Sequence, residues 1–205
     1  AAQQSGAFDR EIVAVEVKGR KGVETIDKDE QPLKGDASKI PTLKPAFVKD
    51  GTITAANASS ISDGAAALVL TRESVAAEKG LKPVARIVAT AAHAHQPAKF
   101  TTAPVDAIRK VLDKAGWKAA DVDLFEVNEA FACVSMIAMH DLGLDHARVN
   151  VNGGATALGH PIGASGARII ATLIAALQNR GGRRGVASLC IGGGEATAVA
   201  LELVD

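Results

Sequence analysis

From about residue 84 onward, short apolar runs typical of strands alternate with longer runs whose apolar residues recur at helical spacing. Pro104 suits a first helical turn, and Gly116, Gly143 and Gly181 follow the helical runs as helix-ending residues. The resulting order, β-α-β-α-α-β-β, predicts a layered α/β fold with a mixed sheet. The predicted strands are 84–92, 122–127, 185–191 and 196–204, and the predicted helices are 104–115, 129–142 and 167–179.

The first 83 residues are less regular. Residues 11–17 alternate enough to predict a strand, with valines on one face. Residues 18–49 carry many charges, three prolines and little periodicity, which predicts an irregular excursion over a surface. Beyond them we expect short strands at 52–56 and 65–71 and a helix at 72–79, closed by Gly80.

Composition excludes several classes of function. Lys and Arg number 23 and Asp and Glu number 23, so the charge balance opposes nucleic-acid binding and attachment to a membrane surface. No apolar run reaches the roughly 18 to 20 residues that span a bilayer, and no signal peptide is visible. Two cysteines are no disulfide framework. We therefore expect a reducing compartment, the cytoplasm.

Three junctions between elements carry side chains suited to chemistry. Asn128 lies between a predicted strand and helix, where it could cap the helix or instead hold a water or stabilise an oxyanion. His160 lies in a loop with five glycines in fourteen residues, and Pro161 holds it away from helical geometry. We favour a functional role for this histidine over a structural one.

Cys190 ends a predicted strand and precedes three glycines, beginning with Gly192, whose bare N–H groups can face a substrate. A cysteine there can act as a thiolate or as an acid and base, or pack as a small hydrophobic residue. Cys133, inside a helix, is expected to pack. His93 and His95 share one face of a strand as a possible metal pair, but no neighbouring cysteine or carboxylate supports it, so we expect no metal.

Taken together, these segments resemble the signature blocks of the thiolase family. The resemblance rests on NEAFA at 128–132, NVNGGATALGHPIGASGAR at 150–168 and LCIGGG at 189–194, with NAS and SDGAAA upstream at 57–67. It implies the thiolase fold, an α/β fold of two similar halves in layers. Residues 1–50 would be the last part of the loop domain, residues 51–82 would be the closing strands and helix of the N-terminal half, and residues 83–205 would form the C-terminal domain.

The resemblance also implies a reaction, the reversible Claisen condensation of two acetyl-CoA molecules or thiolysis of a 3-ketoacyl-CoA, with acyl-CoA substrates and no cofactor. His160 would activate a nucleophilic cysteine and bind the thioester oxygen, and Asn128 would hold a water beside it. Cys190 would be the acid/base thiol, and the Gly192 N–H would complete a second oxyanion hole. The residues that would line the coenzyme A channel are Ser59, Ala58, Phe131 and Phe100.

In the family, the nucleophilic cysteine lies in the N-terminal half. Neither Cys133 nor Cys190 matches the motif of that cysteine, so the resemblance covers the C-terminal portion only. That half is an expected partner, and the 205-residue chain alone is expected to be inactive. A homodimer or homotetramer is a further expectation. The alternatives are a non-catalytic module that binds coenzyme A or serves assembly, and a relative of the ketoacyl synthases, which normally use two histidines with their cysteine.

Overall fold

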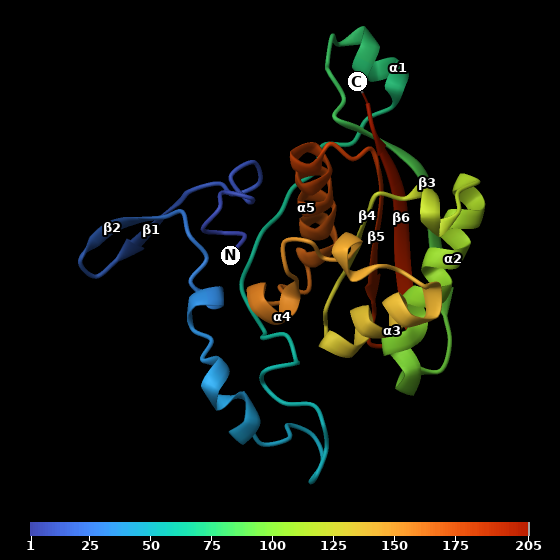
Figure 1. Ribbon diagram of the computed structural model, residues 1–205. Coiled ribbons are helices and arrows are strands. Elements are labelled where there is room, and N and C mark those ends of the chain that lie inside the picture. Colours follow the sequence, from blue (N-terminus) through green and yellow to red (C-terminus); the bar gives the residue numbers. More distant parts are fainter. Residues whose placement is uncertain (205) are drawn as a thin grey trace.

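A four-stranded mixed sheet forms the centre of the computed structural model, which describes residues 1–204 (Figure 1). The strand order is β3-β6-β5-β4, in which β4 and β5 run parallel and the other neighbours run antiparallel. This confirms the predicted α/β class with a mixed sheet. The strands are β3 (Ala85–Ala94), β4 (Leu124–Val127), β5 (Arg184–Cys190) and β6 (Glu195–Leu203).

Helices cover both faces of this sheet. Helices α2 (Ala103–Ala115) and α3 (Ala132–Leu142) pack together on one face, and α5 (Ser165–Arg180) covers the other. The predicted glycines end all three, each with a left-handed backbone. The shorter helices are α1 (Glu73–Glu78) and α4 (Ala155–Leu158), with 3-10 turns at Gln31–Leu33, Ala37–Thr42, Pro97–Thr102, Ala119–Asp121 and His146–Arg148.

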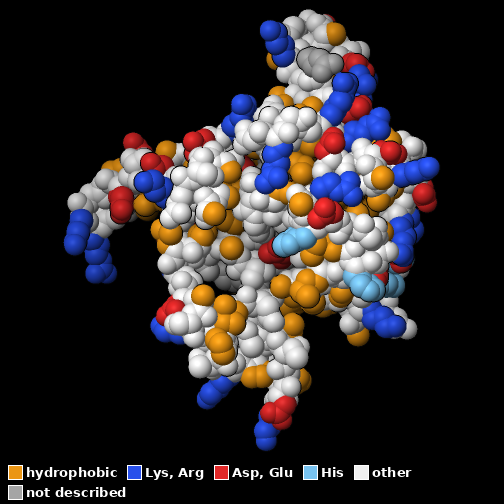
Figure 2. Space-filling model, in the orientation of Figure 1, with side chains coloured by type: hydrophobic (Ala, Val, Ile, Leu, Met, Phe, Trp, Pro, Cys, Tyr) orange, Lys and Arg blue, Asp and Glu red, His pale blue; other side chains and the backbone are white. Residues whose placement is uncertain are grey.

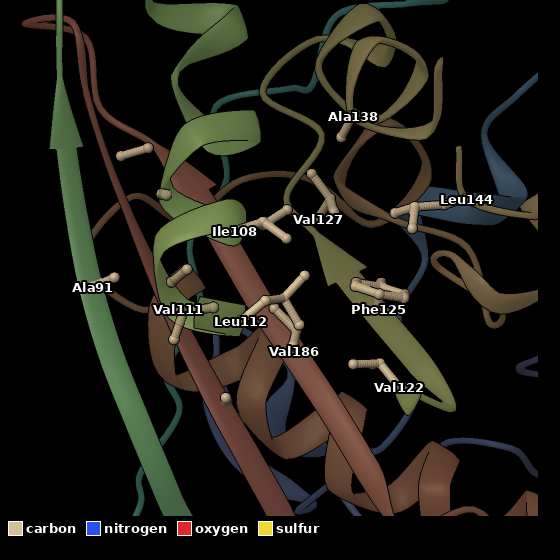
Figure 3. Close-up of a cluster of buried hydrophobic side chains, with 14 of the residues drawn as sticks. Ala91, Ile108, Val111, Leu112, Val122, Phe125, Val127, Ala138, Leu144 and Val186 are labelled. Carbon is tan, nitrogen blue, oxygen red and sulfur yellow. The ribbon is translucent and has the colours of Figure 1, made fainter. Parts of the chain in front are cut away.

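The alternation of side chains along the strands divides the core in two. Phe125 and Val186 face α2 and α3 in the larger cluster (Figure 3), whereas Ala187 faces α5 and packs near Leu173. Phe125, Val186 and Leu173 are completely buried. Burying a side chain of this size stabilises the fold by about 1.5 to 3 kcal/mol. The sheet is therefore anchored on both faces, and its strand ends are held in fixed positions.

The N-terminal part extends away from this core (Figure 1). Strands β1 (Val15–Gly19) and β2 (Gly22–Ile26) form an antiparallel hairpin in which every residue is exposed. The surface excursion predicted for 18–49 is confirmed, since none of these residues is buried, but it is less irregular than expected because it contains β2. A two-residue turn, Arg20–Lys21, was the available signal, but charges on both sides hid it.

The strands predicted at 52–56 and 65–71 are absent, although helix α1 is present as predicted. Val69 is 95% exposed and Leu70 is 66% exposed. A strand needs a neighbour to accept and donate its backbone hydrogen bonds. No strand among residues 1–204 pairs with this apolar run, so it remains extended along the surface.

None of the helices in the described part of the chain is long and apolar enough to cross a membrane.

Candidate active site

The site forms where the parallel strands β4 and β5 end side by side. Asn128 follows β4, and its backbone N–H donates to the Ser188 carbonyl of β5 at 2.9 Å. Cys190 is the last residue of β5. Carboxyl ends of adjacent parallel strands are where open α/β sheets place reactive groups. The sheet therefore brings two of the three predicted junctions to one edge.

The Gly-rich loop brings His160 to the same edge. Gly159 has φ +89°, and a side chain there would collide with Ser62, so the residue before the histidine must be glycine. The His160 N–H then donates to the Ser60 carbonyl at 3.0 Å. These contacts hold the imidazole between the loop and the extended segment that contains Ser60.

Two hydrogen bonds assign the protonation of the His160 ring. The Ser165 hydroxyl donates to the Pro161 carbonyl at 3.0 Å, so its oxygen accepts from His160 Nδ1 at 2.6 Å. The ring proton is therefore on Nδ1, and Nε2 carries the lone pair. Asn128 Nδ2 donates to this Nε2 at 3.3 Å. The geometry presents Nε2 as a base beside a buried amide.

Asn128 does not cap helix α3, so that alternative role is wrong. The helix begins at Ala132, and its N-cap position is Phe131, which makes no side-chain cap. Asn128 is only 1% exposed, and its Oδ1 has no hydrogen-bond partner among residues 1–204. A buried amide oxygen without a partner costs free energy, because it has lost its hydration.

Burial keeps both titratable groups uncharged. Burial, assisted by the nearby Arg168 cation, lowers the pKa of His160 below its ordinary value. Burial, with a smaller contribution from the neighbouring Cys133, raises the pKa of the Cys190 thiol to about 11. At neutral pH the site therefore holds a neutral imidazole and a neutral thiol. This pair can exchange protons with a substrate in both directions.

The glycines after Cys190 form a tight turn. Ile191 N–H donates to the Glu195 carbonyl and Gly194 N–H donates to the Ile191 carbonyl, whereas no hydrogen bond within residues 1–204 uses the Gly192 N–H. Gly194 has φ +101°, and a side chain there would collide with the His95 carbonyl. The turn is therefore fixed against the segment after β3, with the Gly192 N–H left to bind another group.

The predicted coenzyme A residues lie together. Ala58 and Phe131 form an antiparallel bridge, and both the N–H and the hydroxyl of Ser59 donate to the Ala130 carbonyl, at 3.1 and 2.9 Å. The ring of Phe100 lies edge-on to that of Phe131, with centroids 6.1 Å apart. Phe47, which the sequence did not single out, makes a similar contact with Phe131 at 5.9 Å.

Phe47 lies in the N-terminal part of the chain that extends away from the core, where hydrophobic side chains gather on the surface (Figure 2). It is 69% exposed. The sequence signal, an isolated aromatic residue in a charged segment, was too weak to find it. Together the three phenylalanines form an apolar wall beside the segment that contains Asn128.

Arg168 and Glu126 are two further residues of the site that the sequence did not single out. Glu126 is 2% exposed on β4, and Arg168 Nη1 lies 3.8 Å from its Oε2. Burial raises the pKa of Glu126 to about 8, although the Arg168 cation partly offsets the effect. A charged residue in a strand of apolar neighbours was the available signal. Of the two groups, Arg168 is the one whose charge lowers the pKa of His160.

His93 and His95 do have a carboxylate neighbour, contrary to the sequence expectation. His93 Nε2 lies 3.3 Å from Asp106 Oδ2, and ligand atoms of all three residues lie within 4.8 Å of one another. Two cationic side chains already bind this cluster, since Lys110 donates to His93 Nδ1 and Arg109 donates to Asp106. These two cations oppose a bound metal ion, and the prediction that no metal binds remains a prediction.

Comparison with known proteins covers nearly the whole chain. Residues 81–203 match the family model described as the thiolase C-terminal domain, and residues 1–74 match the thiolase N-terminal domain. The chain is 52% identical to an acetyl-CoA acetyltransferase of Allochromatium vinosum over 98% of this chain and 52% of that protein. It is 49% identical to the mouse cytosolic acetyl-CoA acetyltransferase over 98% and 51% of the two chains.

Solved structures give the same result. The fold is similar to that of the Bacillus anthracis acetyl-CoA acetyltransferase, with TM-score 0.95, 47% identity, and coverage of 99% of this chain and 52% of the other. It is also similar to an Ascaris suum thiolase in complex with coenzyme A, with TM-score 0.88, 40% identity, and coverage of 99% and 52%. The chain spans about half the length of the relatives it matches.

Proposed function

Because the chain belongs to the thiolase family and is of the acetyl-CoA acetyltransferase type, we propose that it supplies the acid/base and oxyanion-binding half of that enzyme. The observation that carries the proposal is the pairing of His160 Nε2 with Asn128 Nδ2 at the strand edge where Cys190 ends. The nucleophilic cysteine would come from an N-terminal half, which together with this chain we term the assembled enzyme.

In the cleavage direction, the first step breaks the bond between C2 and C3 of a 3-ketoacyl-CoA. The nucleophilic cysteine passes its proton to His160 Nε2 and attacks the C3 carbonyl. When the bond breaks, C3 remains on the cysteine as a thioester, and the electron pair leaves on C2. Cys190 donates its thiol proton to C2, which releases acetyl-CoA. A neutral thiol with a raised pKa suits this donation.

The second step restores a proton to each of the two cysteines. Coenzyme A enters and gives its thiol proton to the Cys190 thiolate, and its sulfur attacks the acylated cysteine. The shortened acyl-CoA leaves, and the nucleophilic cysteine takes back the proton held by His160. Condensation of two acetyl-CoA molecules is the reverse of these steps. The lowered pKa of His160 supports this exchange, because the ring is neutral when the cycle begins.

Two oxyanion-binding groups belong to the proposal. The first combines His160 Nε2, carrying a proton, with a water held by Asn128, whose buried Oδ1 needs a hydrogen-bond donor. The second uses the backbone N–H of Gly192. Donors aimed at a developing oxyanion are typically worth about 10² to 10³ in rate each.

The same proposal covers the surroundings of the site. Ser59, Ala58, Phe131 and Phe100 line the coenzyme A channel, with Phe47 as an additional apolar contact. The complex of the Ascaris suum thiolase with coenzyme A supports a coenzyme A thioester as substrate. We also propose the division at residues 50 and 82, a homodimer or homotetramer, and a cytoplasmic location, which the name of the mouse relative supports.

The test is thiolysis of acetoacetyl-CoA, followed by loss of its absorbance after addition of coenzyme A. We expect turnover by the assembled enzyme and none by the 205-residue chain alone, because no covalent acyl carrier is then available. Turnover by the isolated chain would contradict the proposed division of roles. Coenzyme A binding without turnover in the assembled enzyme would favour a non-catalytic module.

A further inference from the structure

Glu129, the residue after Asn128, reaches across to the Gly-rich loop. Its Oε1 accepts a hydrogen bond from Asn150 Nδ2 at 2.9 Å, and its Oε2 accepts from the Thr156 N–H at 3.1 Å. One carboxylate therefore joins the segment that carries Asn128 to two separate points of the loop that carries His160. A carboxylate serves both donors at once, because each oxygen is an acceptor.

Asn150 ties the start of this loop to the end of β4. Its Oδ1 accepts from the Val127 N–H at 2.8 Å and its Nδ2 donates to the Val127 carbonyl at 2.9 Å, as a neighbouring strand would. The backbone supports this orientation, since the Asn150 N–H donates to the Phe125 carbonyl and its φ is +47°. Left-handed φ is uncommon outside glycine, although asparagine tolerates it best.

Gly154 leaves room for the Glu129 carboxylate, and helix α4 connects this carboxylate to His160. A Cβ at Gly154 would lie 2.6 Å from both carboxylate oxygens of Glu129, so a larger residue there would displace this carboxylate. Thr156 is the second residue of α4, and Gly159, the residue that follows this helix, directly precedes His160. The path from Glu129 to His160 is thus one hydrogen bond followed by one turn of helix.

We propose that Glu129 and Asn150 are positioning residues that fix the spacing between Asn128 and His160. This inference rests on the proposed function, in which that spacing forms the oxyanion site. The contacts form a closed ring: Asn128 is joined through the chain to Glu129, Glu129 to Thr156, α4 to His160, and His160 Nε2 back to Asn128 Nδ2. Neither positioning residue needs to touch the substrate.

Glu129→Gln tests the ring, because glutamine has the same shape but only one side-chain oxygen. It can accept from Thr156 or from Asn150, and the other donor then faces an N–H group. We expect the loop to loosen and His160 to gain hydration, so that its pKa moves up toward the ordinary value of 6.5.

The measurement is the titration of the His160 ring by NMR in the 205-residue chain, with thermal unfolding followed in parallel. Glu73→Gln is the matched control, since it makes the same chemical change in an exposed ion pair with Arg86. We expect an upward shift of the His160 titration in Glu129→Gln and none in Glu73→Gln. A lower unfolding temperature with an unchanged His160 titration would overturn the inference.

A second measurement needs no variant. Hydrogen exchange of the Thr156 amide in the parent chain should be slow, because this N–H is held by the carboxylate, and rapid exchange would contradict the ring.

A third measurement uses the kinetics of the assembled enzyme. In that enzyme, Glu129→Gln should lower kcat at least tenfold and change KM less than threefold. If the parent enzyme shows no thiolysis, the proposed function fails, and the titration and exchange still decide the positioning role.

Discussion

The neighbours of His160 determine which ring nitrogen carries the proton and which carries the lone pair. The Ser165 hydroxyl accepts the hydrogen bond from Nδ1, and the Asn128 side-chain amide donates a hydrogen bond to the lone pair of Nε2. Asn128 is itself held at the end of β4 by its bond to Ser188. The alignment of an amide and an imidazole is therefore a property of the sheet edge and needs no substrate to form.

Asn128→Ala should reduce turnover of the assembled enzyme about 10²- to 10³-fold, because it removes an oxyanion-site group. The change should leave the unfolding temperature of the chain nearly unaltered, since Asn128 caps no helix. Steady-state thiolysis and thermal unfolding measure the two effects. A large loss of stability with normal specific activity would show that the residue is structural.

The buried Glu126 should make stability depend on pH. Its folded pKa of about 8 lies above the ordinary 4.5, so the folded state holds a proton that the unfolded state releases. Its contribution to stability is thus complete below pH 4.5 and is lost as pH rises to 8, by as much as several kcal/mol. Urea unfolding at pH 5 and pH 8 should show the decline in the parent and a much smaller one in Glu126→Gln. Equal slopes would refute this assignment.

At the scale of elements, the local sequence was sufficient to predict a helix or strand where that element packs against its neighbours. Helix α2 was predictable because Pro104 starts it and Gly116 ends it, and its apolar face meets the sheet. Residues 65–71 have the composition of a strand but find no partner within residues 1–204, so local pattern failed there. The junction residues followed from the strand ends and the glycines.

Other parts of the site depend on contacts that no local pattern records. Ala58 pairs with Phe131, 73 residues away along the chain, and Phe47 contacts the same ring from 84 residues away. The burial of Glu126 beside Arg168 likewise depends on α5 lying over β4. Sequence could name the reactive groups because spacing marks them, but their electrostatic environment is set by tertiary packing.

Gly159→Ala should damage the loop that presents His160. The site has φ +89° and would place a methyl group against Ser62, so we expect a loss of about 1 to 3 kcal/mol. Gly163→Ala is the matched control in the same loop, since φ is ordinary and nothing lies within 4 Å of the added carbon. Urea unfolding should separate the two variants, and equal stability would contradict the strain argument.

For the molecule as a whole, the structure contains a folded sheet with its reactive edge and also surfaces that one chain leaves uncovered. Ile61 is 97% exposed and Val69 is 95% exposed, on the extended segment that passes the site. Such exposed apolar residues support the proposal that an N-terminal half packs here and brings the nucleophilic cysteine to His160. The proposed roles are divided: His160 would activate that cysteine, and Cys190 would serve the later proton transfers.

Mass spectrometry of the assembled enzyme after exposure to acetyl-CoA tests this division most directly. Cys190→Ser should still accept an acetyl group on the nucleophilic cysteine, because acylation needs His160 as base, although turnover should fall by about 10² to 10⁴. His160→Ala should accept little or no acetyl group under the same conditions. Equal acylation of the two variants would contradict this division of roles.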